Sequence, residues 1–218
     1  MNRAPVPVAA VLLAAGRGAR LGHGPKALLQ RADGSTLVEH LSGVLHAGGC
    51  DPVIVVLGAG AAGIRILPGL ARHLVVENPH WEQGMGGSLR SGLAAVPTGH
   101  GALVTLVDEP GLDVATVRRL LAAHRPGRIT VAGYRRPTEP GGAEPAAAGD
   151  VAASPGLRRG HPVLFGAGDL PGARAAAHDE VGARDYLAGN RERLDVVDCS
   201  DRSDGGDVDT VADLHRLG

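Results

Sequence analysis

The sequence contains few aromatic residues and no long apolar run. Aromatic residues make up only 2% of its 218 residues, so we expect a hydrophobic core of alanine, valine and leucine. No apolar run reaches the ~18 residues that a membrane-spanning helix needs. An excess of positive charge is also missing, because the formal net charge is −1. We therefore predict one domain over residues 1–218 that binds neither nucleic acid nor a membrane.

Cysteine is scarce as well. Cys50 and Cys199 form no CxxC pair, which favours a reduced, cytoplasmic protein, although a single disulfide would also fit. Arg3 and the apolar residues 9–15 have some character of a short signal peptide, but two prolines interrupt the beginning and two arginines follow. We predict that this run is a buried first strand.

Segments typical of strands and helices alternate along the chain. Strands are predicted at residues 8–13, 53–57, 73–77, 103–107, 129–132 and 194–197. Helices are predicted at 36–47, 61–70, 87–95, 115–124 and 181–187, the first with Ser35 as N-cap. This alternation predicts an α/β fold, a Rossmann-like three-layer sandwich with a mostly parallel sheet. Ligands of such folds bind at the carboxyl ends of the strands.

One long segment breaks the alternation. Residues 137–160 are rich in proline, glycine and alanine and have almost no large apolar side chains. Such a composition cannot bury much apolar surface, so we predict a flexible surface excursion here.

A glycine-rich loop follows the first predicted strand. It reads Leu13-Ala14-Ala15-Gly16-Arg17-Gly18-Ala19-Arg20-Leu21-Gly22, with Lys26 shortly after it. The glycines let backbone N–H groups approach an anion closely, and the two arginines and the lysine add positive charge. A P-loop is excluded, because Lys26 lies between Pro25 and Ala27 and no Ser or Thr follows it. The loop therefore suits a polyphosphate outside the P-loop class.

Two acidic motifs lie further along the chain. Asp108 follows the fourth predicted strand in Leu106-Val107-Asp108-Glu109-Pro110, where a carboxylate can hold Mg²⁺ together with phosphate oxygens. A turn or a helix N-cap is the alternative for such an aspartate. The second motif, Asp207-Val208-Asp209-Thr210-Val211-Ala212-Asp213-Leu214, would by itself be an ordinary acidic turn, with Asp213 at the start of a final helix.

Together these motifs resemble the nucleotidyltransferases of molybdenum-cofactor biosynthesis. The first loop fits LAAGxGxRxG-x(3)-K-x-LL, residues 207–214 fit DxDT-x-x-DL, and residues 78–93 fit N-P-x-W-x-x-G-M-x-x-S-L-x-x-G-L. The cytidylyltransferase branch is the most similar, since Ala15 stands where the guanylyl branch usually has glycine. The resemblance runs from Val8 to Leu214, except for residues 137–160, and implies a fold of the nucleotide-diphospho-sugar transferase type.

The resemblance also implies an activity and a set of residues. It predicts transfer of a nucleoside monophosphate, preferably CMP, from a nucleoside triphosphate, CTP over GTP, to a phosphorylated small-molecule acceptor such as molybdopterin, with release of pyrophosphate. Arg20 and Lys26 become the catalytic cations, Asp108 and Asp209 the Mg²⁺ ligands, and Asp207 a helper. The implied nucleotide-binding residues are Leu13, Ala14, Ala15, Gly16, Arg17, Gly18, Asn78, Gly84 and Ser88. Trp81 is expected to be a packing anchor.

Two later segments are similar to the acceptor side of that family. Residues 160–165 fit G-x-P-x-x-F, and residues 179–184 fit D-x-x-GAR, although His178 stands where glycine is usual. The resemblance implies that His161 and Arg184 bind the acceptor. A structural salt bridge is an equal alternative for Arg184.

A competing motif favours a different class of enzyme. Gly58-Ala59-Gly60-Ala61-Ala62-Gly63 is a GxGxxG that follows a predicted strand, and Glu77 lies near the distance at which dinucleotide folds place their ribose-binding acid. This motif predicts an NAD(P)H-dependent oxidoreductase, and some relatives of the family are named nicotine-blue reductases. We rank it second, because GxGxxG is common in a chain with 34 glycines. A catalytically silent binding protein ranks third, since Arg20, Lys26, Asp108 and Asp209 are all present.

Overall fold

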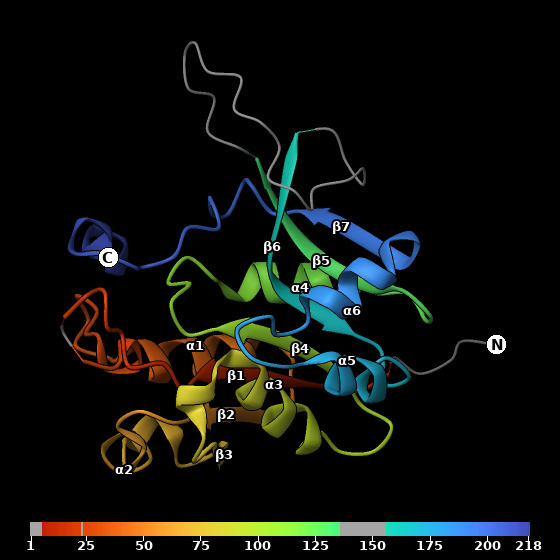
Figure 1. Ribbon diagram of the computed structural model, residues 1–218. Coiled ribbons are helices and arrows are strands. Elements are labelled where there is room, and N and C mark those ends of the chain that lie inside the picture. The colour runs from red at the N-terminus through yellow and green to blue at the C-terminus, as the bar shows by residue number, and fades with distance from the viewer. Residues whose placement is uncertain (1–5, 23, 136–155) are drawn as a thin grey trace.

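In the computed structural model, the described residues are 6–22, 24–135 and 156–218. They form one seven-stranded sheet with the strand order β3-β2-β1-β4-β6-β5-β7 (Figure 1). The strands are β1 (Val8–Ala14), β2 (Val53–Leu57), β3 (Leu74–Glu77), β4 (Gly101–Leu106), β5 (Ile129–Arg135), β6 (Leu157–Phe165) and β7 (Leu194–Asp198). Strand β6 runs antiparallel to β4 and β5, and all other pairs are parallel. The predicted mostly parallel sheet and six of its strands are confirmed.

Strand β6 was not predicted. Gly160 and Pro162 interrupt its apolar pattern, and proline cannot donate a ladder hydrogen bond. The structure accommodates them with a register shift, since the β5–β6 pairing passes from Val131↔Val163 to Gly133↔Arg159. The predicted excursion is therefore too long at its end, because residues 157–160 begin β6. Residues 137–155 of that excursion lie outside the described residues.

Helices cover both faces of the sheet, as the sandwich prediction requires (Figure 1). On one face, α1 (Leu37–Gly48), α2 (Ala61–Ile64), α4 (Val114–Ala123) and the 3₁₀ segment η5 (Val211–Leu217) pack into one apolar cluster. On the other face, α3 (Met85–Ala94), α5 (Leu170–Ala176) and α6 (Arg184–Gly189) pack into a second cluster. Alanine, valine, leucine and isoleucine dominate both clusters, which confirms the predicted core.

Several helix boundaries differ from the predictions. Helix α1 is capped by Thr36, which forms a capping box with Glu39, whereas Ser35 bonds to Asp33 instead. The predicted helix over residues 61–70 is only α2, followed by the 3₁₀ turn η2 (Pro68–Leu70), because a proline and two glycines lie within it. Helix α5 was not predicted.

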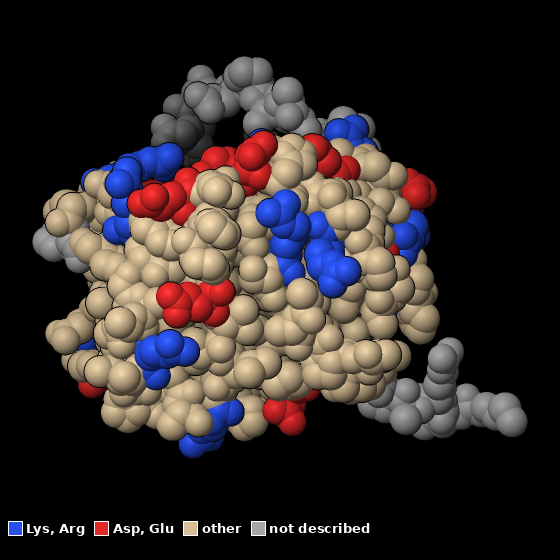
Figure 2. Space-filling view, turned by 60° about the horizontal axis from the view of Figure 1, so that its bottom comes forward, with Lys and Arg blue, Asp and Glu red and all other residues tan. Residues whose placement is uncertain are grey.

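The surface and the cysteines agree with the composition. Figure 2 shows a mostly uncharged face, with many of its Asp and Glu side chains along the upper edge and its Lys and Arg side chains in small groups. Both cysteines are buried free thiols, so the disulfide alternative is wrong. None of the described helices is long and apolar enough to cross a membrane.

Candidate active site

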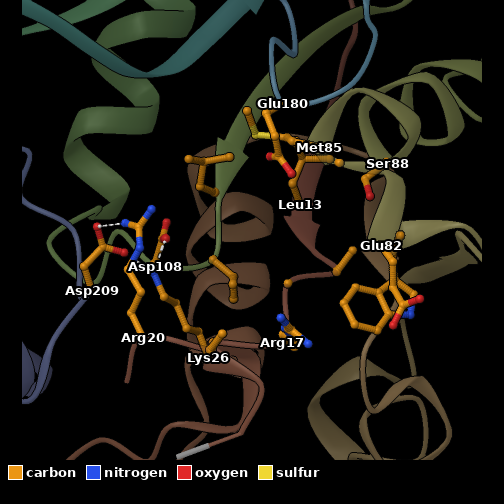
Figure 3. Close-up of a pocket in the computed structure, with 18 residues that line it drawn as sticks. Leu13, Arg17, Arg20, Lys26, Glu82, Met85, Ser88, Asp108, Glu180 and Asp209 are labelled. Carbon is orange, nitrogen blue, oxygen red and sulfur yellow. Dashed lines mark hydrogen bonds and ion pairs between the residues drawn. The ribbon is translucent and has the colours of Figure 1, made fainter. Parts of the chain in front are cut away.

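A cavity of about 640 Å³ opens at the carboxyl ends of β1 and β4. Its walls come from the glycine-rich loop after β1, from the beginning of α3, from the end of β4 and from the C-terminal segment. Of the predicted site residues, those that line it are Leu13, Ala15, Gly16, Arg17, Gly18, Arg20, Lys26, Gly84, Ser88, Asp108 and Asp209. Figure 3 shows Arg20, Lys26, Asp108 and Asp209 on one side of this cavity and Glu82 and Ser88 on the other.

The glycine-rich loop has a conformation that depends on Gly18. Its φ of +65° is left-handed, and a Cβ at this position would collide with the carbonyl oxygen of Gly24. The loop closes through hydrogen bonds from Leu21 N–H and Gly22 N–H to the carbonyl oxygen of Gly18. Gly16 faces open space. The sequence therefore folds the loop back on itself while leaving its first half open beside the cavity.

Lys26 joins two aspartates that are far apart in the sequence. Its Nζ lies 2.7 Å from Asp108 Oδ2 and 2.5 Å from Asp209 Oδ1, and only 14% of its side chain is exposed. Burial disfavours the charged ammonium, but the hydrogen bonds to Asp108 and Asp209 outweigh burial and raise the pKa of Lys26. A backbone hydrogen bond from Val208 N–H to the carbonyl oxygen of Asp108 ties the C-terminal segment to the end of β4. The cluster is thus held by both backbone and side chains.

Arg20 is attached more loosely to the same cluster. Its Nη1 lies 3.5 Å from Asp209 Oδ2, and 80% of its side chain is exposed. An exposed ion pair of this kind contributes little stability. The guanidinium is therefore free to turn toward an anion in the cavity.

The acidic side of the cluster fits a divalent cation. Asp108 Oδ1 is buried and has no hydrogen-bond partner among the described residues. Burial raises the pKa of Asp207 to about 6, and the nearby carboxylates of Asp108, Glu109 and Asp209 add to this shift. Within the described residues, no group of three or more His, Cys, Asp or Glu side chains could hold a metal alone. Mg²⁺ needs no such cage, because one or two carboxylates and the oxygens of a phosphate suffice.

Glu109 is a site residue that the sequence reasoning missed. It is 8% exposed and accepts hydrogen bonds from Thr105 Oγ1 at 3.0 Å and from His161 Nδ1, which lies 3.2 Å away. The sequence feature that could have pointed to Glu109 is its position between Asp108 and Pro110. His161, predicted to bind the acceptor, is thus held by an acid at the edge of the metal cluster.

The His161–Glu109 pair predicts a pH-dependent contribution to stability. Burial lowers the pKa of His161, but the hydrogen bond and charge of Glu109 outweigh it and raise this pKa above 6.5. A raised folded pKa gives stability that is complete below 6.5 and is lost as the pH rises through the folded pKa. We expect His161→Gln to be less stable than the wild type at pH 5, with the gap shrinking toward pH 9. Urea unfolding measures this gap, and the exposed His80→Gln is the control. A gap that is constant with pH would contradict the pairing.

The glycines at the beginning of α3 also make room for a neighbouring loop. Gly84 has a φ of +108°, and a Cβ at Gly84 or at Gly86 would collide with the backbone of residues 178–180. Gly86 N–H donates a 2.7 Å hydrogen bond to the carbonyl oxygen of Asp179. These glycines therefore let the chain's own loop approach α3, and that loop places Glu180 in the cavity wall.

Five predicted site residues, the helper Asp207 among them, do not line this cavity. Ala14 is buried in the core, and Asn78 is 4% exposed and donates to Ser88 Oγ at 3.0 Å. Asn78 is thus positioned to orient Ser88. His161 and Arg184 line a neighbouring cavity instead. Trp81, expected to be a packing anchor, does line the main cavity.

The competing GxGxxG loop is packed against neighbouring residues. A Cβ at Gly58 would lie 2.5 Å from Cβ of Trp81 and 2.8 Å from the carbonyl oxygen of Ala15. Gly60 abuts Pro25, and the helix that follows, α2, has only four residues. Glu77 lies 3.6 Å from Arg65, in an exposed ion pair. These contacts explain the glycines by packing and leave no long helix N-terminus for a pyrophosphate.

Comparisons with known proteins place the chain among nucleotide-handling enzymes. The family model "MobA-like NTP transferase domain" matches residues 10–196. Nicotine blue oxidoreductase from Paenarthrobacter nicotinovorans is 44% identical over 210 residues, which cover 96% of each chain. The crystal structure of Rv0371c from Mycobacterium tuberculosis H37Rv matches with a TM-score of 0.74 and 28% identity over 98% of each chain. A complex of Rv0371c with manganese matches with a TM-score of 0.69 and 28% identity over 97% of each chain.

Proposed function

The chain belongs to the MobA-like NTP transferase family, and we propose that it is a divalent-metal-dependent nucleotidyltransferase that prefers CTP. The observation that carries this proposal is the cluster in which Lys26 joins Asp108 and Asp209 beside the open glycine-rich loop. A polyphosphate would pair with Lys26 and the loop, and a divalent cation would pair with the two aspartates. The manganese complex of Rv0371c supports a divalent cation in this family.

The proposed reaction is transfer of a nucleoside monophosphate to a phosphorylated acceptor. An oxygen of the acceptor phosphate forms a bond to the α-phosphorus, the bond from this phosphorus to the β-bridging oxygen breaks, and pyrophosphate leaves with that oxygen. An anionic phosphate needs no general base. Molybdopterin is the acceptor that the family resemblance suggests. Catalysis of this kind consists mainly of positioning and of charge stabilisation.

The residues of the chain have distinct parts in that reaction. Backbone N–H groups of the loop from Ala15 to Gly18 hold the phosphates. Arg20 and Lys26 neutralise charge on the α-phosphate and on the departing pyrophosphate. Asp108 and Asp209 would hold Mg²⁺, which supplies further charge neutralisation when bound. Ser88, oriented by Asn78, is a hydrogen-bonding group on the opposite wall.

The preference for CTP rests on Ala15. This residue is 7% exposed and lines the cavity. A methyl group there reduces the space that a base can occupy, which favours the smaller pyrimidine.

A second candidate is an NAD(P)H-dependent oxidoreductase of the nicotine-blue reductase type. The observation that favours it is the 44% identity to nicotine blue oxidoreductase along 96% of the chain. In that case we expect the dinucleotide in the main cavity rather than at Gly58–Gly63, because Trp81 and Pro25 pack against that loop.

Ligand-induced stabilisation separates the two candidates. A ligand at 100 times its Kd stabilises the native state by about 2.7 kcal/mol, which raises the Tm of a domain of this size by roughly 5–10 °C. We expect this shift with Mg-CTP, a smaller one with Mg-GTP, and none with NADH or NADPH. Trp81 is the only tryptophan and lines the cavity, so quenching of its fluorescence gives an independent titration. A shift with NADH or NADPH alone would overturn the transferase proposal in favour of the oxidoreductase.

A further inference from the structure

A second cavity of about 480 Å³ adjoins the first. Leu13, Met85 and Leu106 line both cavities, so the two share a wall. The second cavity lies on the face of the sheet that α3, α5 and α6 cover, over β4, β5 and β6. Its size is within the usual range of ligand sites, roughly 300–1,000 Å³.

The interior of this cavity is apolar because of how the sheet is built. Val104, Val131 and Val163 project from three neighbouring strands, and Phe165, Leu89 and Leu187 complete the lining. The first five belong to the buried apolar cluster of this face, and Leu187 packs against that cluster. Protein cores normally pack to near-crystalline density. Here valines on the strands and short helices beside them leave a space that an apolar molecule would fill.

The rim carries positive charge that is only partly neutralised. The cationic lining residues are Arg159, His161, Arg184 and Arg191; His161 is paired with Glu109, and the one acidic lining residue, Asp185, lies 3.3 Å from Nε2 of His178. Within the described part of the chain, neither the Arg184 nor the Arg191 side chain forms a hydrogen bond or an ion pair. The salt bridge considered for Arg184 is therefore not formed there. Unpaired guanidinium groups are well suited to a phosphate or carboxylate.

We propose that the second cavity binds an acceptor whose body is an apolar ring system or chain, in place of the polar pterin of molybdopterin, and which carries a phosphate at the arginine-bearing rim. The role as acceptor rests on the proposed nucleotidyl transfer, whereas the class of ligand rests on the cavity alone. The lining argues against a sugar phosphate, because β4, β5, β6 and α3 offer valine, leucine and phenylalanine side chains where hydroxyl groups would need partners.

Three matched probes test the ligand class by calorimetry on the full chain. 1-Naphthyl phosphate has both features, 1-naphthol lacks the phosphate, and glucose 1-phosphate has the phosphate on a polar body. We expect 1-naphthyl phosphate to bind at least tenfold more tightly than either of the others. Equal binding of glucose 1-phosphate would overturn the proposal, as would equal binding of 1-naphthol.

Variants locate the binding. Val163→Phe should fill the cavity and reduce affinity for 1-naphthyl phosphate at least tenfold. Leu187→Trp should fill the cavity from α6 and reduce the affinity to the same degree, and it replaces the first variant if that variant fails to fold. Arg184→Gln should weaken binding at least fivefold, whereas Arg174→Gln, an exposed arginine on α5 outside the cavity, should not. Affinity that survives both filling variants would show that the probe binds elsewhere, and the assignment would fail.

A separate titration with Mg-CTP distinguishes failure of this inference from failure of the proposed function. If the wild type does not bind Mg-CTP but its affinities for the three probes follow the expected order, the transferase proposal fails and the ligand class stands. If it binds Mg-CTP but its affinities for the probes do not follow the expected order, the cavity proposal alone is wrong.

Discussion

Asp108→Asn is expected to reduce pyrophosphate release by roughly 100- to 1,000-fold, the effect of removing one preorganised charge-stabilising group. Asp108 follows β4, lies 2.7 Å from Lys26 Nζ, and has a second carboxylate oxygen that is buried without a partner in the described chain. Asparagine keeps the shape of the side chain but removes the charge that a divalent cation requires. Pyrophosphate release from Mg-CTP, assayed with molybdopterin and with 1-naphthyl phosphate as acceptors, measures the loss.

Asp108→Asn should change the affinity for CTP in opposite directions with and without Mg²⁺. Mg-CTP affinity should fall at least roughly tenfold, in line with the loss of a metal-site interaction. CTP without Mg²⁺ should bind the variant more tightly than the wild type, because a carboxylate that repels the triphosphate is gone. Asp201→Asn is the control, since Asp201 is also ion-paired but at Arg119, outside the cavity. A parallel fall of both affinities would contradict a metal role for Asp108.

Lys26→Met is expected to inactivate the enzyme and to lower its stability without Mg²⁺. The substitution leaves Asp108 and Asp209 facing each other without their shared counter-ion. Breaking a fully buried pair costs about 3–5 kcal/mol, and this part-exposed cluster should lose about 2 kcal/mol. Added Mg²⁺ should restore most of that loss in the variant and change the wild type less. Thermal unfolding with and without MgCl₂ measures both effects.

The sequence offers a chemical check on the same residue. Lys26 is the only lysine in the chain, so an amine reagent has this side chain and the N-terminus as its targets. Mg-CTP should protect Lys26 from modification, whereas NADPH should not. Lys26→Arg should regain stability but little activity, because a guanidinium carries charge in a different shape. Full activity in that variant would contradict a positioned ammonium.

The sequence predicted those parts of the fold that local pattern controls. The apolar runs of β1 and β2 and the amphipathic pattern of α1 are local properties, and their boundaries agree with the structure within one residue. β6 depends on pairing with β4 and β5, which a segment with Gly160 and Pro162 does not reveal. Helix α5 has a proline and a glycine in a seven-residue span, and only packing against α3 and α6 makes it helical.

For the candidate site too, local motifs were informative, whereas contacts made by tertiary packing were not predicted. The family resemblance of the motifs grouped Arg20, Lys26, Asp108 and Asp209 as site residues, and the structure places all four at one cavity. Nothing local could show that Gly84 and Gly86 make room for residues 178–180, or that Glu109 holds His161. Those contacts join residues that tertiary packing alone brings together. At the GxGxxG loop the opposite happened. The local motif matched a dinucleotide-binding pattern, but in the structure its glycines are required by close packing against Trp81 and Pro25.

Anomalous diffraction from crystals grown with CTP and Mn²⁺ would locate the metal ion and the triphosphate in one experiment. We predict one manganese peak within about 2–2.5 Å of carboxylate oxygens of both Asp108 and Asp209. We also predict CTP phosphates against the loop from Ala15 to Gly18, and Lys26 Nζ moved from between the aspartates toward those phosphates. Nucleotide density without manganese at these two aspartates, or manganese bound only elsewhere, would contradict the account.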